Sequence, residues 1–401
     1  EKIKSILSLN GNVKIIDREN KIKIEGEDVT YYATPPFREK IVSTGAEFRS
    51  YCEHDIFERQ LGHGGLLGGM AALIETTEGI MDALVSEMKT TRPDYILMEA
   101  HAVWANLLQQ ITKVPAATLC SMFAFNQSLI SNNELIEYVY ENAPDETLLD
   151  GLKGLTDYST ITQRIDQRYA TRSPGIVDFI GNPQDLNIVF TSREFQQGGE
   201  AFDDSYRFVG PSVSSRLEDK GFPFEKLGPE PLIYISLGTM YNDELDFYHS
   251  CFEAFSDTPF QVVMAVGNRL AMSGLAKEPD NFIVREYVPQ LQILERASLF
   301  ITHGGLNSAH EGMLHDVPMI LLPQQADHFV VARRVVDLGA GVIATREDLQ
   351  PDAIRRKANL VLEDPSYREN SRQIGEALRN AGDAVCAANE VFAFKKRKAL
   401  E

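Results

Sequence analysis

Short apolar runs alternate with segments of helical periodicity along most of the chain. Each run has the length and the boundaries typical of a buried strand. The expected strands span residues 3–9, 28–33, 94–98, 115–120 and 186–190 in the first half, and 232–235, 260–266, 282–284, 299–302 and 318–322 in the second. This alternation predicts an α/β fold of two doubly wound sheets that face each other across a cleft.

Two segments depart from the regular series. Residues 212–231 are rich in Pro, Gly, Ser and charge, which predicts a linker between two domains. Residues 13–26 stand where a crossover helix would join two parallel strands, yet they partly alternate apolar and polar residues around a turn-like centre. That pattern favours a hairpin, so the N-terminal end does not fit the rest of the series.

The composition is that of a globular protein with a strong acidic balance. The 401 residues suffice for two domains, and 39 basic against 58 acidic side chains give a formal charge of -19. Such a surface repels phosphate backbones and anionic membranes, so we expect neither nucleic acid nor a membrane as a partner. A polyanionic ligand must then be held by local dipoles and a few donors.

The cysteines indicate neither a zinc ribbon nor a disulfide framework. Cys52, Cys120, Cys251 and Cys386 are far apart and form no C-x-x-C pair, which fits a reducing compartment. No apolar run approaches the ~20 residues that a membrane helix needs, and the start of the sequence shows no long apolar region of a signal peptide. We therefore expect a cytoplasmic protein.

A polar, Gly-rich turn follows the strand at 299–302. His303, Gly304 and Gly305 lead into a helix that opens with Asn307 and Ser308. Backbone N–H groups and a helix N-terminus meet at such a turn, which suits a phosphate. The alternative is a tight turn with a satisfied histidine, and the polar loops at neighbouring strand ends favour the phosphate site.

Glu311 has two interpretations. Ser308 and Glu311 have the spacing of a capping box, in which each side chain bonds a backbone N–H of the first turn. Alternatively, Glu311 accepts hydrogen bonds from the diol of a sugar. On spacing alone the capping box is at least as favoured.

Three further polar loops follow strands of the second half. Each has a structural alternative, either a helix N-cap or, for the loop with Pro289, a helix start. The candidate ligand-binding residues are Ser236, Gly238 and Thr239 in the first loop, Tyr287, Val288 and Gln290 in the second, and Asp327 and His328 in the third.

Several familiar sites are excluded. The chain has no G-x-G-x-x-G after a strand and no G-x-x-x-x-G-K-[ST]. His310 and His315 are five residues apart, which places them ~140° apart on a helix, so they cannot share a zinc ion as an i,i+4 pair does.

Together these elements resemble the macrolide and flavonoid UDP-glycosyltransferases of the GT-B fold. The resemblance is specific from Tyr287 to Asp327 and weaker over most of the chain. It implies an acceptor-binding N-terminal domain over residues 1–215, a nucleotide-sugar-binding C-terminal domain over 229–382, and a final helix at 383–401 that packs back on the N-terminal domain.

The resemblance also implies a role for each candidate. Tyr287 would stack on uracil while Val288 and Gln290 contact its edge, and Glu311 would hold the ribose diol. Asp327 would hold the transferred sugar beside His328, which replaces the family's usual Gln. The residues that would serve the pyrophosphate are Thr239, His303, Asn307 and Ser308, beside the close backbone approach at Gly304 and Gly305.

The implied reaction is an inverting displacement in which a base deprotonates an acceptor hydroxyl. Neutral donors and a helix N-terminus meet the charge on UDP, so we expect no metal and no cofactor beside the donor substrate. In the family the base is a histidine in a G-H-x-N-P turn, oriented by an aspartate. Here Asn12 stands nearest to the histidine, and an amide cannot act as this base.

Glu99 is the counterpart of the aspartate, and we take it as the candidate catalytic carboxylate. His101 lies close by and is a substitute base, or else a histidine of a helix start or core. The leading hypothesis is a UDP-sugar-dependent transferase, for glucosyl transfer to a hydroxyl of an apolar small molecule such as a macrolide or flavonoid. The alternatives are a catalytically impaired nucleotide-sugar-binding protein and a UDP-sugar epimerase.

Overall fold

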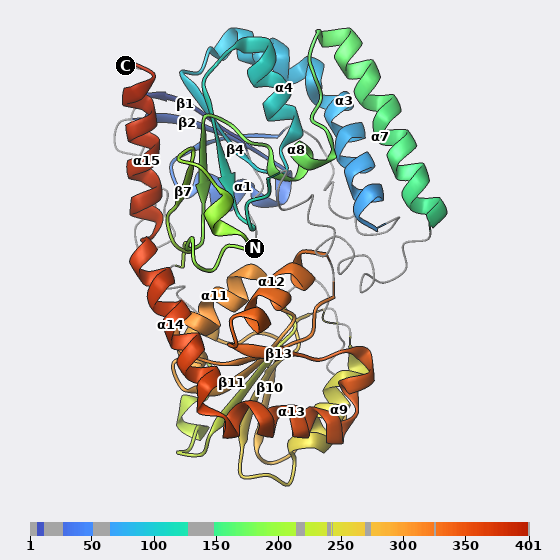
Figure 1. The fold of residues 1–401 in the computed structure, drawn as a ribbon, viewed down its shortest axis with the longest axis vertical. Coiled ribbons are helices and arrows are strands. Elements are labelled where there is room, and N and C mark those ends of the chain that lie inside the picture. The colour runs from blue at the N-terminus through green and yellow to red at the C-terminus, as the bar shows by residue number, and fades with distance from the viewer. Residues whose placement is uncertain are drawn as a thin grey trace. The chain divides into compact units, whose positions relative to one another are not determined.

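The computed structural model describes residues 6–11, 27–50, 65–126, 148–213, 221–238, 242, 244–268, 274–324 and 326–399. Contacts between Cα atoms divide the chain into two compact units. Unit 1 comprises Glu1–Ser214 with Ala381–Glu401, and unit 2 comprises Ser215–Asn380. Each unit holds one sheet with helices on both of its faces (Figure 1).

Unit 1 contains a seven-stranded sheet of order β3-β2-β1-β4-β5-β6-β7. Its strands are β1 (Ile6–Gly11), β2 (Glu27–Ala33), β3 (Glu47–Ser50), β4 (Tyr95–Glu99), β5 (Ala116–Cys120), β6 (Leu186–Val189) and β7 (Tyr206–Phe208). The pairs β2–β3, β4–β5, β5–β6 and β6–β7 are parallel, whereas β1 is antiparallel to both of its neighbours. The third strand of this order, β1, therefore runs against the others.

Alternating side chains of the unit 1 strands feed two separate cores. Tyr31 and Leu97 belong to a core that α1 and α15 complete, whereas Tyr32 and Met98 belong to a core under α3, α4, α7 and α8. Strands buried on both faces are expected in a sheet covered by helices on both sides. The helices are α1 (Arg38–Val42), α3 (Gly65–Thr91), α4 (Val103–Thr112), α7 (Leu148–Tyr169), α8 (Ile176–Gly181) and α15 (Ala384–Arg397).

The last helix of the chain is part of the unit 1 core. Asp383 caps α15 by accepting hydrogen bonds from the backbone N–H of Val385 and Cys386. The helix then buries Val391 and Phe394 in the core that contains Tyr31. On the other face, α3 and α7 lie side by side (Figure 1) and are joined by an ion pair between Glu78 and Arg164, with 2.6 Å between Oε2 and Nη2.

Unit 2 contains a six-stranded, fully parallel sheet of order β10-β9-β8-β11-β12-β13. This is the order of a dinucleotide-binding sheet made of two mononucleotide halves. Its strands are β8 (Leu232–Ser236), β9 (Gln261–Ala265), β10 (Phe282–Arg285), β11 (Ala297–Thr302), β12 (Met319–Leu321) and β13 (Gly341–Ile343).

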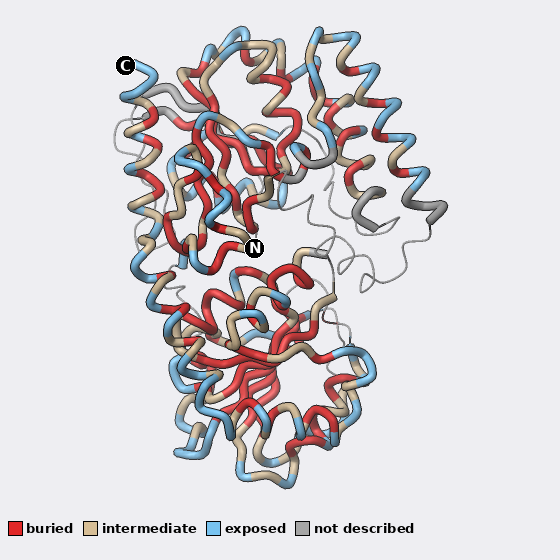
Figure 2. The backbone as a smooth tube through the Cα atoms, in the orientation of Figure 1, coloured by how far each residue is buried: buried red, intermediate tan, exposed pale blue. Residues whose placement is uncertain are grey.

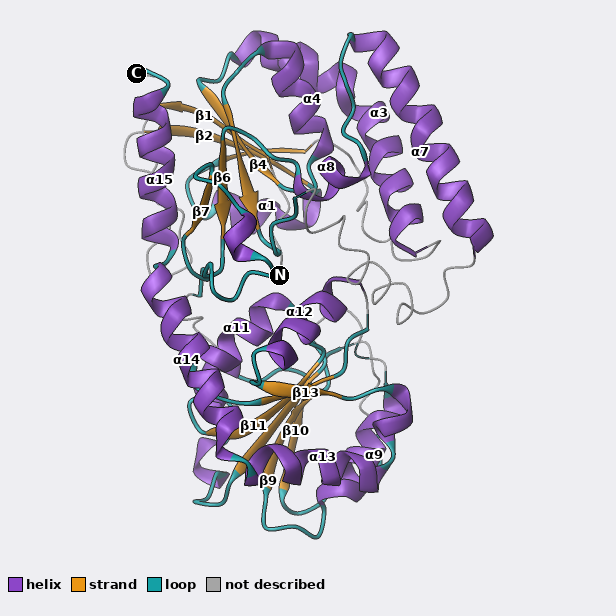
Figure 3. Cartoon of the chain, in the orientation of Figure 1, coloured by secondary structure: helices purple, strands orange, loops and turns teal. Residues whose placement is uncertain are grey.

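Helices cover both faces of the unit 2 sheet. Figure 3 shows α9 and α13 on one face and α11 and α12 on the other. The strands between them are buried (Figure 2), and the rings of Tyr234 and Phe300 stack with centroids 4.8 Å apart. The helices are α9 (Leu245–Phe255), α10 (Gln290–Leu294), α11 (Leu306–Leu314), α12 (Ala326–Asp337), α13 (Pro351–Glu363) and α14 (Pro365–Ala381).

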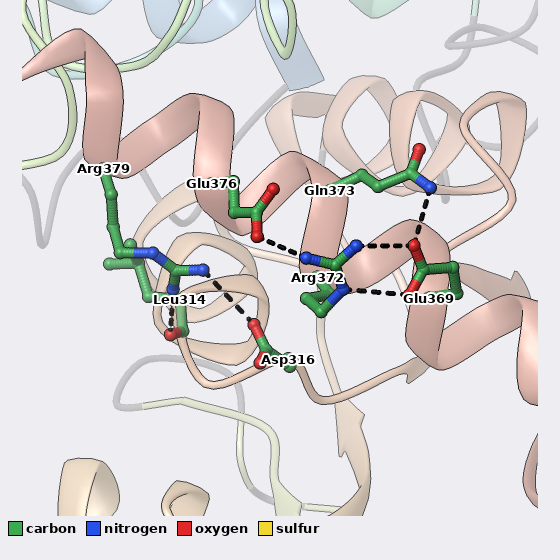
Figure 4. A network of polar contacts seen from close by, with 7 residues as sticks. All are labelled: Leu314, Asp316, Glu369, Arg372, Gln373, Glu376 and Arg379. Atoms are coloured by element: carbon green, nitrogen blue, oxygen red, sulfur yellow. Dashed lines mark hydrogen bonds and ion pairs between the residues drawn. The ribbon is translucent and has the colours of Figure 1, made fainter.

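Helix α14 is tied to the end of α11 by a polar network (Figure 4). Arg379 donates to the carbonyl oxygen of Leu314 at 2.7 Å and lies 3.5 Å from a carboxylate oxygen of Asp316. Arg372 pairs with Glu369 one turn away, with 2.6 Å between Nη2 and Oε1. A guanidinium that bonds a last-turn carbonyl satisfies one of the acceptors left open at a helix C-terminus.

Every strand expected from the sequence is present to within a few residues, and three strands were not expected. The additional strands are β3, β7 and β13, and each lies at the edge of its sheet. Their residues are partly exposed, so they form no continuous apolar run. The hairpin expected over 13–26 lies outside the described residues, and the strands on either side of it are antiparallel.

Within the part of the chain that the structure describes, the helices are all too short or too polar to cross a membrane.

Two helical glycines should respond in opposite ways to a methyl group. A Cβ on Gly375 of α14 would lie 2.1 Å from the backbone oxygen of Met313, whereas a Cβ on Gly79 of α3 would meet no atom within 4 Å. We expect Gly375→Ala to destabilise unit 2 by about 1–3 kcal/mol through overpacking. Gly79→Ala should stabilise unit 1 by about 0.5–1 kcal/mol, because alanine favours the helix.

Urea unfolding followed by hydrogen-exchange mass spectrometry measures the free energy of unfolding of each unit separately. A neutral or stabilising effect of Gly375→Ala would contradict the close packing of α14 on α11.

Candidate functional site

The turn between β11 and α11 is built around two glycines. Gly304 has a φ of +80°, in the left-handed region that favours glycine. A Cβ on Gly305 would lie 2.5 Å from Nε2 of His303, so only glycine fits beside that ring. Gly305 is the N-cap residue of α11 and no side chain caps the helix there. The first-turn N–H groups and the helix dipole are thus available to an anion.

The expected capping box is wrong. Helix α11 begins at Leu306, so Ser308 is its third residue and not its cap. The sequence pattern misplaced the helix start because two glycines and a leucine carry no strong start signal. Asn307 and Ser308 consequently lie in the first turn of α11.

Glu311 is held by a buried polar relay. It is 2% exposed, and its Oε2 accepts a hydrogen bond of 2.6 Å from Nε2 of Gln290. The amide oxygen of Gln290 in turn accepts from the hydroxyl of Tyr234 at 2.8 Å. Three elements, β8, α10 and α11, therefore fix the carboxylate. No feature of the sequence points to Tyr234, because this residue lies within an apolar run.

The side chain of Gln290 points into unit 2. Both ends of its amide are engaged by Tyr234 and Glu311, so the side chain orients Glu311. Just before it, Val288 is half-buried and the ring of Tyr287 is 52% exposed. Pro289 is the N-cap residue of α10, one position before the helix that it was expected to start. An exposed aromatic ring at a strand end suits stacking on a flat ligand.

Two histidine rings meet beside the glycine turn. His303 and His328 pack edge to face with centroids 4.5 Å apart, and Nδ1 of His303 lies 3.3 Å from the hydroxyl of Thr302. His328 is only 4% exposed. A Cβ on Gly238 would lie 2.7 Å from the His303 ring, so the loop after β8 also reaches this point.

The loop after β8 is not a helix cap, contrary to the alternative read from the sequence. Helix α9 begins only at Leu245, with Glu244 as its N-cap residue. Instead the side chain of the fully buried Asn242 donates to the carbonyl oxygen of Gly238 at 2.9 Å, and Ser236 is buried at the strand end. Thr239 lies outside the described residues.

Asp327 lies in the first turn of α12, which begins at Ala326, so it is not the N-cap of that helix either. The helix ends as expected near Gly339, whose φ of +68° is that of a left-handed C-terminal glycine.

In unit 1, Glu99 ends β4 and forms a cluster with two neighbours. It is 4% exposed and accepts hydrogen bonds from the backbone N–H of His101 at 2.7 Å and the hydroxyl of Ser121 at 2.9 Å. Nδ1 of His101 lies 3.1 Å from Oε1 of Glu99. Asn12 lies outside the described residues. The sequence named Glu99 and His101 but could not show that they are paired.

The chain is similar to proteins of known sequence. The model of the Erythromycin biosynthesis protein CIII-like C-terminal domain matches residues 252–387. The uncharacterized UDP-glucosyltransferase YojK of Bacillus subtilis is 33% identical over 94% of this chain and 93% of its own length. The NDP-glycosyltransferase YjiC of Bacillus licheniformis is also 33% identical, over 92% of this chain and 91% of its own.

Solved structures show the same architecture. The calicheamicin glycosyltransferase CalG4 is 26% identical, with a TM-score of 0.74 over 92% of this chain and 91% of its own. The fold and the nucleotide-type sheet thus define a glycosyltransferase of the GT-B class. Within that class, the chain belongs to the macrolide and flavonoid type of UDP-glycosyltransferase.

One histidine of α11 should make unit 2 sensitive to acid. His310 is buried, and desolvation lowers its pKa from 6.5 to about 3. Below about pH 6.5, His310 is protonated in the unfolded chain but stays neutral in the folded chain. The stability contributed by neutral His310 is therefore present above that pH and is lost as the pH falls.

We expect this residue to cost unit 2 about 2 kcal/mol of unfolding free energy between about pH 7.5 and pH 5. His310→Gln removes the titrating group. The free energy of unfolding of the wild type minus that of the variant should therefore decrease by that amount as the pH falls. Urea unfolding at the two pH values measures it. A gap that stays constant would show that His310 does not resist protonation in the folded state.

Proposed function

We propose that this protein is a UDP-sugar-dependent, inverting glycosyltransferase that transfers glucose to a hydroxyl group of an apolar small molecule such as a flavonoid or macrolide. The observation that carries the proposal is the uncapped N-terminus of α11 behind Gly304 and Gly305. It offers fixed N–H donors to a diphosphate in a protein whose net charge of -19 otherwise repels anions.

The surrounding side chains fit a UDP-sugar in the roles that the family resemblance gives them. Exposed Tyr287 would stack on uracil, with the backbone around Val288 at the edge of the base. Glu311 would accept from the ribose diol, an assignment supported by the relay that holds its carboxylate in one orientation. A fixed acceptor loses little conformational entropy when the sugar binds.

The diphosphate and the sugar would be held at the ends of β8, β11 and β12. His303, Asn307, Ser308 and Thr239 would serve the pyrophosphate, and Asp327 would hold hydroxyls of the transferred sugar. Because hydroxyl, imidazole and backbone N–H donors can meet the charge that develops on UDP, the proposed reaction uses no metal ion and no cofactor beyond its donor substrate.

His328 differs from the Gln that the family usually has beside this aspartate. Its ring is buried against His303, so it supports the proposed pyrophosphate histidine instead of reaching a sugar hydroxyl. The names of the relatives support the donor: two are a UDP-glucosyltransferase and an NDP-glycosyltransferase. A demethyllactenocin mycarosyltransferase and an oleandomycin glycosyltransferase support an apolar natural product as acceptor.

A nucleotide-sugar-binding protein without transferase activity is the second candidate. The observation that favours it is the reversed β1 of unit 1. In the related enzymes the base is expected after the first strand, and here Asn12 takes that position in the sequence.

Turnover and binding separate the two candidates. We expect the protein to release UDP from UDP-glucose only when a flavonol or a macrolide is present, with the glucoside detected by mass spectrometry. Release without an acceptor would instead indicate hydrolysis. Calorimetric binding of UDP with no glucoside from any acceptor would establish the second candidate, and a lack of UDP binding would contradict both.

Tyr287 provides a test of the nucleotide site. We expect Tyr287→Ala to weaken UDP binding by about 1–3 kcal/mol, or about 5- to 150-fold in Kd, because the stacking partner of the base is lost. Tyr287→Phe should bind nearly as the wild type. Phe392→Ala, which removes a 37% exposed ring from α15 in unit 1, is the matched control and should leave Kd unchanged. An equal Kd for UDP in Tyr287→Ala and the wild type would show that this ring does not contact the nucleotide.

A further inference from the structure

We infer that His101, oriented by Glu99, is the general base that deprotonates the acceptor hydroxyl. The inference rests on the proposed function, since it assigns a residue for the proton transfer in that reaction. It is carried by the geometry at the carboxyl end of β4 in unit 1.

Because β1 runs antiparallel to β4, the carboxyl end of β1 lies far from the carboxyl end of β4. Ile6 pairs with Met98 near the carboxyl end of β4, and Leu9 pairs with Tyr95 at its beginning. These pairs lie about 10 Å apart along the strand. Gly11, the last residue of β1, pairs with Glu27 at the start of β2. The carboxyl end of β1 therefore points away from Glu99, toward the beginning of β4.

The pair of His101 and Glu99 supplies a base at that ligand edge. Both carboxylate oxygens lie within hydrogen-bond distance of Nδ1 of His101, at 3.1 and 3.2 Å. A carboxylate only accepts, so Nδ1 carries the proton and Nε2 of the neutral ring has a lone pair for a substrate proton. The side chain of His101 is 16% exposed, so the ring is partly accessible.

Glu99 is fixed more firmly than a carboxylate in a surface ion pair. Its Oε1 accepts from Ser121 at the end of β5, its Oε2 accepts from the backbone N–H of His101, and its side chain is 5% exposed. These bonds favour the charged carboxylate, which stabilises the imidazolium that forms when His101 takes a proton. Glu99 thus acts as a positioning residue and does not itself reach the substrate.

His101 has no role as a helix cap, and the neighbouring thiol does not compete with it as a base. His101 does not cap α4, whose N-cap residue is Ala102 and which has no side-chain cap. Cys120, beside the cluster, is not a competing base, because burial and the charge of Glu99 raise its pKa to about 12.

In the inferred step, one proton moves to His101 and one electron pair leaves with UDP. Nε2 of His101 takes the proton of the acceptor hydroxyl while that oxygen forms a bond to the anomeric carbon of the sugar. The bond from the anomeric carbon to the β-phosphate oxygen breaks, and its electron pair leaves with UDP. The attack from the opposite side inverts the anomeric configuration, and the imidazolium later gives its proton to water.

The first test is His101→Gln with UDP-glucose and an alcohol acceptor. We expect kcat to fall by about 10²- to 10⁴-fold, the usual contribution of a general base. Kd for UDP should not change. Trp104, the sole tryptophan, is buried in α4, and its fluorescence should give the same unfolding midpoint for the variant and the wild type.

Acceptors of different acidity distinguish a general base from a residue that only supports the structure. A nitrophenol that is largely ionised at the assay pH needs no base, so the loss in His101→Gln should shrink by about tenfold or more relative to the alcohol. A structural defect would lower both rates equally and would overturn the assignment.

Glu99→Gln tests the positioning role. The variant keeps the size of the side chain and removes its charge, so kcat should fall while KM for UDP-glucose stays the same. His249→Gln is the matched control for the histidine substitution, since His249 lies on α9 of unit 2, where its ring accepts from the backbone N–H of Ala276. We expect it to keep wild-type kcat.

The outcomes for the inference and for the proposed function are distinct. If the wild type transfers glucose and His101→Gln stays within about threefold of its kcat, His101 is not the base and the proposed function stands. If the wild type binds UDP but glucosylates no acceptor, both the function and the base assignment are overturned.

Discussion

The local structure at the start of α11 in unit 2 depends on the close approach of backbone and imidazole at the turn after β11. Gly304 adopts a left-handed conformation, and Gly305 leaves no room for a side chain beside His303. Because of this, the chain passes from a buried strand into α11 without a capping side chain. The same helix carries Glu311, so the strand end and the first turns of α11 fix the uncapped helix N-terminus and the carboxylate together.

Rigid elements, not loops, orient that carboxylate. The relay from Tyr234 through Gln290 to Glu311 joins a strand and two helices in the interior of unit 2. A buried polar network is stable only when each member has its partner, which confines each side chain to one arrangement. The proposed ribose contact would therefore be formed before the ligand binds, whereas the exposed Tyr287 ring is free of such packing.

In unit 1 the direction of a single strand decides which groups share the ligand edge of the sheet. With β1 reversed, the carboxyl ends of β4 and β5 lie side by side at this edge. Glu99, His101 and Ser121 meet there because parallel neighbours end side by side. The carboxylate and the imidazole of this pair lie 3.1 Å apart.

The sequence by itself determined the central strands, the glycine turn and the misfit of residues 13–26, because apolar runs and glycine pairs report burial and backbone freedom along the chain. Tertiary structure decided the edge strands β3, β7 and β13, which are too exposed to show an apolar run. It also decided the direction of β1, the inward turn of Gln290 and the partner of His101. Strand direction and contacts such as Gln290 with Glu311, 21 residues apart, depend on how distant segments pack, and no local period records that.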